Sequence, residues 1–162
     1  MIEFFTDLLT INFLLAFGIV ILGGIMHGYT GWGGGMVMMP LMTLIFPPVE
    51  SLALICVGGI VLTAQLYPSA MRTANWVAMR PLYIMLFIAT PLGGLLLLYL
   101  DPSLVRKVIG VIIIAASILI LTGWQYRGHR GLGAASVFGS IAGLANGFSG
   151  VGGPAMVVYI LA

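Results

Sequence analysis

The chain alternates long apolar runs with short polar or glycine-rich connections. A membrane-spanning helix needs about 20 predominantly apolar residues. Three successive runs approach that length and predict three full membrane crossings, at residues 51–71, 81–100 and 104–122. The fold class that follows is all-α, a polytopic membrane protein.

A glycine-rich stretch from His27 to Gly35 interrupts the apolar sequence before these crossings. Each glycine costs a helix about 1 kcal/mol relative to alanine, so the first helix should end there. The next apolar run, 36–46, ends at Pro47-Pro48, which a helix does not continue through without a kink. One helix over residues 11–46 would be about 54 Å long, too long for an ordinary span. We therefore predict two antiparallel helical arms joined at the glycine turn, a broken hairpin over residues 9–46.

Composition supports a membrane protein and excludes several other classes. Hydrophobic residues make up 61% of the chain and charged residues 6%, whereas soluble domains have about 25% charged residues. The sequence has no basic patch of the kind that would predict nucleic-acid binding. The single cysteine, Cys56, cannot form a disulfide or a cysteine-based metal site within the chain, and nothing indicates a cofactor. Glu3 and Asp7 precede the first apolar run, where a secretory signal would carry Lys or Arg, so we expect this run to be retained.

The glycine-rich pattern recurs near the C-terminal end as Gly147-Phe-Ser-Gly-Val-Gly-Gly-Pro154. A gapless alignment pairs Gly28 with Gly147, Thr30 with Ser149, Gly31 with Gly150, and Gly33-Gly34 with Gly152-Gly153. Two interrupted apolar segments at corresponding positions are typical of an internal repeat in a transporter. Three crossings separate the two breaks, and this odd number predicts that the second hairpin is inverted relative to the first.

A helix that begins after a glycine turn exposes main-chain N–H groups and the positive end of its dipole, which favour anions. His27 and Asn146 precede the two turns at equivalent positions. Ionisable or amide side chains at membrane depth are candidates for binding a substrate. Their alternative role is a helix cap or an interhelical hydrogen bond. No catalytic or metal-binding residue is predicted. The predicted substrate-binding residues are His27, Thr30, Gly33, Gly34, Gly35, Asn146, Ser149, Gly152, Gly153 and Pro154.

The paired motifs Gly31-Trp-Gly-Gly-Gly-Met-Val-Met-Met-Pro40-Leu41 and Gly147-Phe-Ser-Gly-Val-Gly-Gly-Pro-Ala-Met-Val-Val-Tyr159 resemble those of the TauE/SafE sulfite exporter family. The resemblance extends over essentially the whole chain. It implies a multi-pass protein of the bacterial inner membrane that carries sulfite, an organosulfonate or a related sulfur anion by alternating access. It also implies a longer chain, with three further spans after the second hairpin.

The resemblance divides the chain into a first repeat (1–122), a cytoplasmic loop (123–131) and the start of a second repeat (132–162). The expected partners are the sulfur anion and membrane lipid, and a homo-oligomer is compatible with the sequence. Two other functions remain open. Gly147-Phe-Ser-Gly150 fits the short Gly-x-Ser-Gly pattern of rhomboid intramembrane proteases, with Ser149 as nucleophile, and a membrane scaffold without transport activity is the third hypothesis.

Lys and Arg near span ends favour the cytoplasmic side. Arg72, Arg80, Arg127 and Arg130 flank two loops that are separated by two crossings, so we predict that both loops face the cytoplasm. A cysteine introduced at position 128 should then be protected, in intact cells, from an impermeant thiol reagent added outside. Labelling of that cysteine from outside would contradict this topology.

Overall fold

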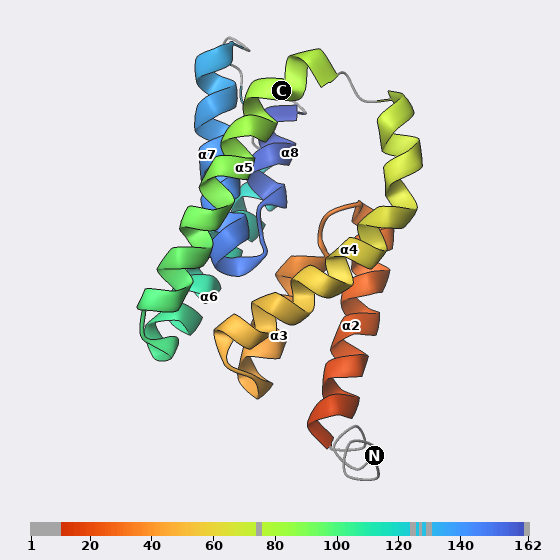
Figure 1. Ribbon diagram of the computed structural model, residues 1–162, viewed down its shortest axis with the longest axis vertical. Helices are drawn as coiled ribbons and strands as arrows, with labels where there is room; N and C mark the ends of the chain where they lie inside the picture. Colours follow the sequence, from red (N-terminus) through yellow and green to blue (C-terminus); the bar gives the residue numbers. More distant parts are fainter. Residues whose placement is uncertain (1–10, 74–75, 124–125, 127, 129–130, 161–162) are drawn as a thin grey trace.

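The computed structural model describes residues 11–73, 76–123, 126, 128 and 131–160, whose regular secondary structure is entirely helical (Figure 1). The predicted all-α class is therefore confirmed. The helices are α2 (Ile11–Thr30), α3 (Gly34–Ile45), α4 (Pro48–Thr73), α5 (Trp76–Tyr99), α6 (Pro102–Leu121), α7 (Leu132–Ser149) and α8 (Gly153–Ile160).

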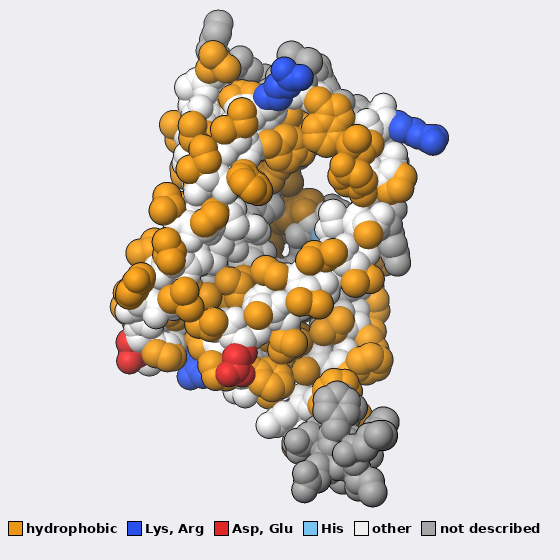
Figure 2. Space-filling view, in the orientation of Figure 1, with side chains coloured by type: hydrophobic (Ala, Val, Ile, Leu, Met, Phe, Trp, Pro, Cys, Tyr) orange, Lys and Arg blue, Asp and Glu red, His pale blue; other side chains and the backbone are white. Residues whose placement is uncertain are grey.

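Several of these helices are suited to cross a membrane. By length and apolar composition the candidates are Ile11–Thr30, Met79–Tyr99, Pro102–Leu121 and Leu132–Ser149, and α3 is a shorter apolar helix. Figure 2 shows apolar side chains over the middle of the molecule and charged side chains at its two ends. This distribution is typical of a multi-pass membrane protein.

The first hairpin is broken where the sequence predicts it, because α2 ends at Thr30 and α3 begins at Gly34. The α7–α8 hairpin has a corresponding break between Ser149 and Gly153. In Figure 1 the α2–α3 hairpin approaches the middle of the molecule from the end that carries the N-terminus, and the α7–α8 hairpin approaches it from the other end. The three intervening helices α4, α5 and α6 account for this inversion.

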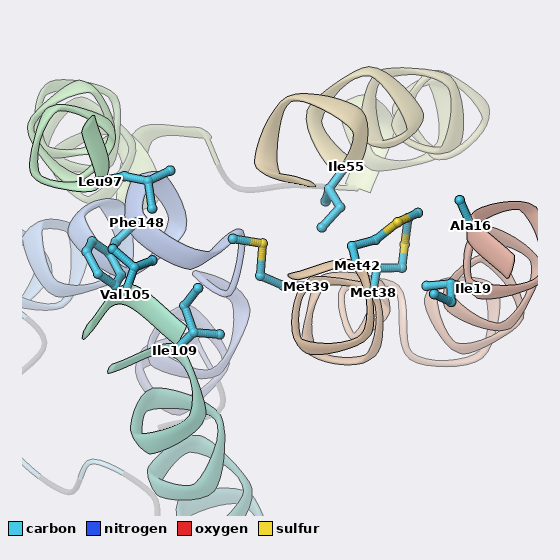
Figure 3. Packing of buried hydrophobic residues seen from close by; sticks show 10 residues of the cluster. All are labelled: Ala16, Ile19, Met38, Met39, Met42, Ile55, Leu97, Val105, Ile109 and Phe148. Carbon is cyan, nitrogen blue, oxygen red and sulfur yellow. The ribbon is translucent and has the colours of Figure 1, made fainter. Parts of the chain in front are cut away.

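Small residues allow α2 and α3 to pack closely. A Cβ atom on Gly23 of α2 would overlap the side chain of Met38 on α3. Since lipid tails are as apolar as the side chains themselves, such close packing is a main source of helix association in a membrane. Met38 belongs to a buried cluster that joins the two hairpins (Figure 3), made of Ala16, Ile19, Met38, Met39, Met42, Ile55, Leu97, Val105, Ile109 and Phe148.

A glycine stripe on α7 provides the closest helix contact, with α5. A Cβ atom on Gly139 would overlap the carbonyl oxygen of Leu82, and one on Gly143 would lie 2.6 Å from that of Leu86. Glycines at these positions therefore let the backbones of α5 and α7 touch. The contacting residue numbers rise together along both helices, so α5 and α7 run parallel. α6, which lies between them in the sequence, runs in the opposite direction.

The connection between α5 and α6 is a tight turn, as the sequence predicts. Asp101 caps α6 by accepting a hydrogen bond from the Ser103 main-chain N–H at 2.8 Å, and Pro102 occupies the first helical position. Hydrogen bonding by the side chain of Ser103, and then by its main-chain N–H, lowers the pKa of the Asp101 carboxyl.

The C-terminal end of α3 is stabilised by a residue of α6. The Arg106 Nε atom donates a hydrogen bond of 2.9 Å to the carbonyl oxygen of Thr43. That carbonyl belongs to the last turn of α3, where helix geometry leaves acceptors free and the dipole favours a cation. Arg106 therefore holds the far end of the helix whose first turn forms part of the glycine break. Of the four arginines predicted to face the cytoplasm, Arg127 and Arg130 lie outside the described residues.

We predict that Arg106→Gln lowers the free energy of unfolding by about 1 kcal/mol, because it removes a charged donor from the end of α3. The midpoint of thermal unfolding in detergent measures this loss. Lys107→Gln is the matched control, since it removes the same charge one residue further along α6. Equal losses in the two variants would show that α3 does not depend on Arg106.

Candidate functional site

The first glycine break is shaped by Thr30 and Gly31. Gly31 adopts a left-handed conformation with φ of 76°, and its N–H donates to the His27 carbonyl at 2.7 Å. The Thr30 hydroxyl donates to the Met26 carbonyl and accepts from the Gly33 N–H, both at 2.8 Å. Thr30 therefore ties the end of α2 to the turn, and glycine at position 31 supplies the positive φ without strain.

The second break is built in the same way. Gly150 is left-handed with φ of 67°, and its N–H donates to the Asn146 carbonyl at 2.8 Å. The Ser149 hydroxyl donates to the Ala145 carbonyl at 2.7 Å. Pro154 follows at the second position of α8, where its missing N–H leaves no helical hydrogen bond unmade. Both helices thus end on a left-handed glycine preceded by a hydroxyl residue.

The contacts after the turns correct the residue pairing taken from the sequence. A Cβ atom on Gly34 would lie 3.0 Å from the Gly23 carbonyl oxygen and 3.1 Å from the His27 Cβ. The glycine with the equivalent contacts in the second break is Gly152, whose Cβ atom would lie 2.8 Å from both the Ala142 carbonyl oxygen and the Asn146 Cβ.

Gly34-Gly35 therefore corresponds to Gly152-Gly153, whereas the gapless alignment pairs Gly33-Gly34 with them. Three residues separate the helices in both breaks, but the first break has one residue more between its left-handed glycine and the glycine that contacts the preceding helix. A gapless alignment cannot detect this difference, because a run of three glycines, 33–35, matches two glycines equally well in either register.

The two breaks touch each other at two places. A Cβ atom on Gly35 would overlap the carbonyl oxygen of Gly150, and one on Gly153 would overlap the ring of Trp32. Each hairpin therefore places a residue of its turn against the first helical turn of the other. The two contacts differ, because the counterpart of Gly150 is Gly31 and not Trp32.

The first turns of α3 and α8 present main-chain N–H groups at this contact. Their positions lack an intrahelical carbonyl partner. Among the described residues, the N–H groups of Gly34, Gly35, Gly152 and Gly153 make no hydrogen bond outside the helices. Donors from both hairpins are therefore free at the place where the hairpins meet.

These glycines open on a cavity of about 980 Å³. Figure 2 shows a hollow in the middle of the molecule. The described lining contains no Asp, Glu, Lys or Arg, and it consists of His27, Gly31, Trp32, Gly34, Gly35, Met38, Ile55, Cys56, Gly59, Ile60, Thr63, Ala64, Tyr67, Tyr83, Leu86, Asn146, Gly150, Gly152, Gly153 and Met156.

The family model of the sulfite exporter TauE/SafE matches residues 16–162, which is most of the chain. The chain belongs to the TauE/SafE family. Comparison with curated proteins found no match, and neither did comparison with solved structures. Membership makes the chain a protein of a membrane transporter family, consistent with the apolar helices described above.

The TauE/SafE chain brings most of its predicted site residues to the cavity, and their role in binding remains a prediction. Those that line it are His27, Gly34, Gly35, Asn146, Gly152 and Gly153. The other four, Thr30, Gly33, Ser149 and Pro154, lie outside the lining. The hydroxyl protons of Thr30 and Ser149 are donated to main-chain carbonyls, so these two residues shape the turns.

Several lining residues were not among the predicted site residues. Met38 and Met156 follow the two breaks at equivalent positions in the corrected register, and Trp32 lies in the first turn. Tyr67 and Trp32 are residue types that often anchor a helix at the membrane interface, so their type does not indicate a binding site. For Trp32, the one signal in the sequence is its place within the glycine-rich repeat.

The position of Ser149 gives no support to a protease. The residue is fully buried, with 0% of its surface exposed. Its hydroxyl is occupied by the Ala145 carbonyl, and it does not line the cavity. A serine nucleophile needs a positioned base and access to its substrate.

The contact between Gly153 and Trp32 can be tested by a double-mutant cycle. Gly153→Ala should lower the free energy of unfolding by about 1–3 kcal/mol, because its methyl group enters the space of the indole ring. Adding Trp32→Ala should recover part of that loss, and thermal unfolding in detergent measures both. Gly133→Ala is the control, because no atom lies within 4 Å of a Cβ there. Strictly additive effects of the two substitutions would contradict the contact.

Proposed function

We propose that the protein transports a small sulfur-containing oxyanion, sulfite or an organosulfonate, across the bacterial inner membrane. Transport proceeds by alternating access around the two glycine breaks. The observation that carries this proposal is that two half-helices from opposite ends of the molecule begin at one cavity, with free N–H groups in both first turns. Family membership supplies the class of cargo.

The chemistry of the cavity favours an anion. Helix N-termini carry partial positive charge, and their free N–H groups point along the helix axis toward a ligand bound at the helix end. The described lining has no carboxylate to repel an anion and no Lys or Arg to hold it as a tight ion pair. Neutral dipoles of this kind suit a carrier that must also release its cargo.

Glycine at the tips has a second role beyond the turn itself. Gly34 and Gly152 let each half-helix begin directly against the helix before it, because that helix fills the space that a side chain would occupy at either position. Side chains of modest polarity, His27 and Asn146, flank these glycines on the preceding helices. Main-chain N–H groups and these two side chains form the proposed coordination sphere of the oxyanion.

The packing of the helices supports a mechanism of alternating access. The α2–α3 hairpin packs mainly within itself and against α4, while α7 packs mainly against α5 and α8. The tips of the two hairpins meet where Gly35 lies against Gly150 and where Trp32 lies against Gly153. Alternating access requires one hairpin to move relative to the other at this contact while the anion stays between them.

The test is anion flux in vesicles that contain the complete protein. Gly34→Val and Gly153→Val should abolish uptake or release of sulfite while leaving membrane insertion intact, because a branched side chain blocks close approach to the main chain and disfavours the turn. Gly110→Val on α6 is the matched control, since no atom lies within 4 Å of a Cβ there. Normal insertion together with the parental flux in both tip variants would show that the breaks are not the site.

A further inference from the structure

His27 and Asn146 occupy equivalent places in the two hairpins but differ in chemistry. Each precedes its turn by the same number of residues, contacts the corresponding glycine, Gly34 or Gly152, and lines the cavity. In the part of the chain that the structure describes, neither side chain has a hydrogen-bond partner. An imidazole exchanges its proton between about pH 5 and 8, whereas an amide does not titrate.

The surroundings of His27 contain few other groups that titrate. The helices packed on α2 are α3 and α4. α3 carries no titratable side chain, and on α4 the charged residues Glu50 and Arg72 stand in its first and last turns. α4 places Cys56 and Tyr67 at the cavity.

Three further elements complete the surroundings. α5 places Tyr83 at the cavity, and Arg80 lies one turn before it and outside the lining. α7 and α8 contribute Asn146 and Met156 but no titratable side chain to the lining. On α2 itself Tyr29 is 88% exposed. The other titratable side chains at the cavity are a thiol and phenols, so His27 is the one imidazole among the described lining residues.

We propose that His27 binds one proton together with the anion, so that the cargo crosses the membrane with a proton as its coupling ion. This inference rests on the proposed transport function and identifies the residue that carries the coupling. The imidazole takes the proton from water, and no covalent bond to the anion forms or breaks.

The physical basis is the linkage between two sites of opposite charge. The ring of His27 lies beside the first turn of α3, since a Cβ on Gly34 would be 3.4 Å from its Nδ1 atom. An anion held by the N–H groups there attracts an imidazolium at the same place. Each ligand must then raise the affinity of the other by the same factor. The pair also carries less net charge than the anion alone, and net charge is costly at membrane depth.

The substitution His27→Asn distinguishes an effect of proton binding from an effect of altered packing. Asn146 shows that this fold accommodates an asparagine at the equivalent place, with the same contacts to the following glycine. His27→Asn therefore removes the titratable ring and leaves a side chain that the repeat already tolerates. The other histidine of the chain, His129, provides the control variant His129→Asn.

The experiment is calorimetric titration of the complete purified protein with methanesulfonate, whose charge does not change between pH 6 and 8. The wild-type protein and His129→Asn should take up close to one proton per anion, shown by the dependence of binding heat on the ionisation enthalpy of the buffer. Their affinity should rise as pH falls, by up to about tenfold per pH unit. His27→Asn should take up no proton and should bind with an affinity that does not change with pH.

Each other result has a definite meaning. Proton uptake that persists in His27→Asn would overturn the proposal, and so would wild-type affinity that does not vary with pH. Complete loss of binding in a folded His27→Asn protein would also overturn it, because the N–H groups and Asn146 remain. If the wild-type protein binds neither methanesulfonate nor sulfite at any pH, the proposed transport function itself is wrong.

Discussion

The structure depends on one constraint, the cost of an unpaired main-chain polar group in a hydrocarbon environment. Non-helical backbone at membrane depth is tolerated only where it is buried in protein or lines a water-filled cavity. Both glycine breaks obey this rule. Thr30 and the left-handed glycines Gly31 and Gly150 satisfy part of each turn, and the N–H groups that remain free lie at the cavity between the hairpins. The two helix breaks are therefore the places where a polar ligand can be bound.

The remaining helices hold the two breaks against each other. Glycines on α7 let its backbone lie directly on α5, and Gly23 receives Met38 between α2 and α3. Neither contact needs a hydrophobic driving force, which a membrane does not provide between apolar helices. Arg106 adds a charged hydrogen bond at the far end of α3. Each half-helix is thus held by its neighbours along its length, and the tips meet where Gly35 lies against Gly150 and Trp32 against Gly153.

The two hairpins are similar but not identical, and their differences lie at the cavity. The first break has one residue more between its left-handed glycine and the glycine that contacts the preceding helix, and its Trp32 covers Gly153 of the other hairpin. His27 stands where the second hairpin has Asn146, so only one of the two equivalent positions carries a titratable side chain. An approximate twofold arrangement accounts for the meeting of the tips. The departures from symmetry give the two sides of the proposed anion site different chemistry.

The sequence by itself determined the membrane class, the helical fold and the existence of two glycine breaks, because apolar run length and clustered glycines act locally on the chain. It also indicated His27 and Asn146, which stand at equivalent positions before the turns. Only the tertiary structure decided which glycines correspond, since Gly33 and Gly35 are indistinguishable in a sequence and differ only in what surrounds them. It also decided that the hydroxyls of Thr30 and Ser149 bind carbonyls of their own helices, and that Trp32, Met38 and Met156 line the cavity. The sequence does not show which residue a glycine or an apolar side chain will contact. Close approach between helices far apart in the sequence depends on how the whole chain packs.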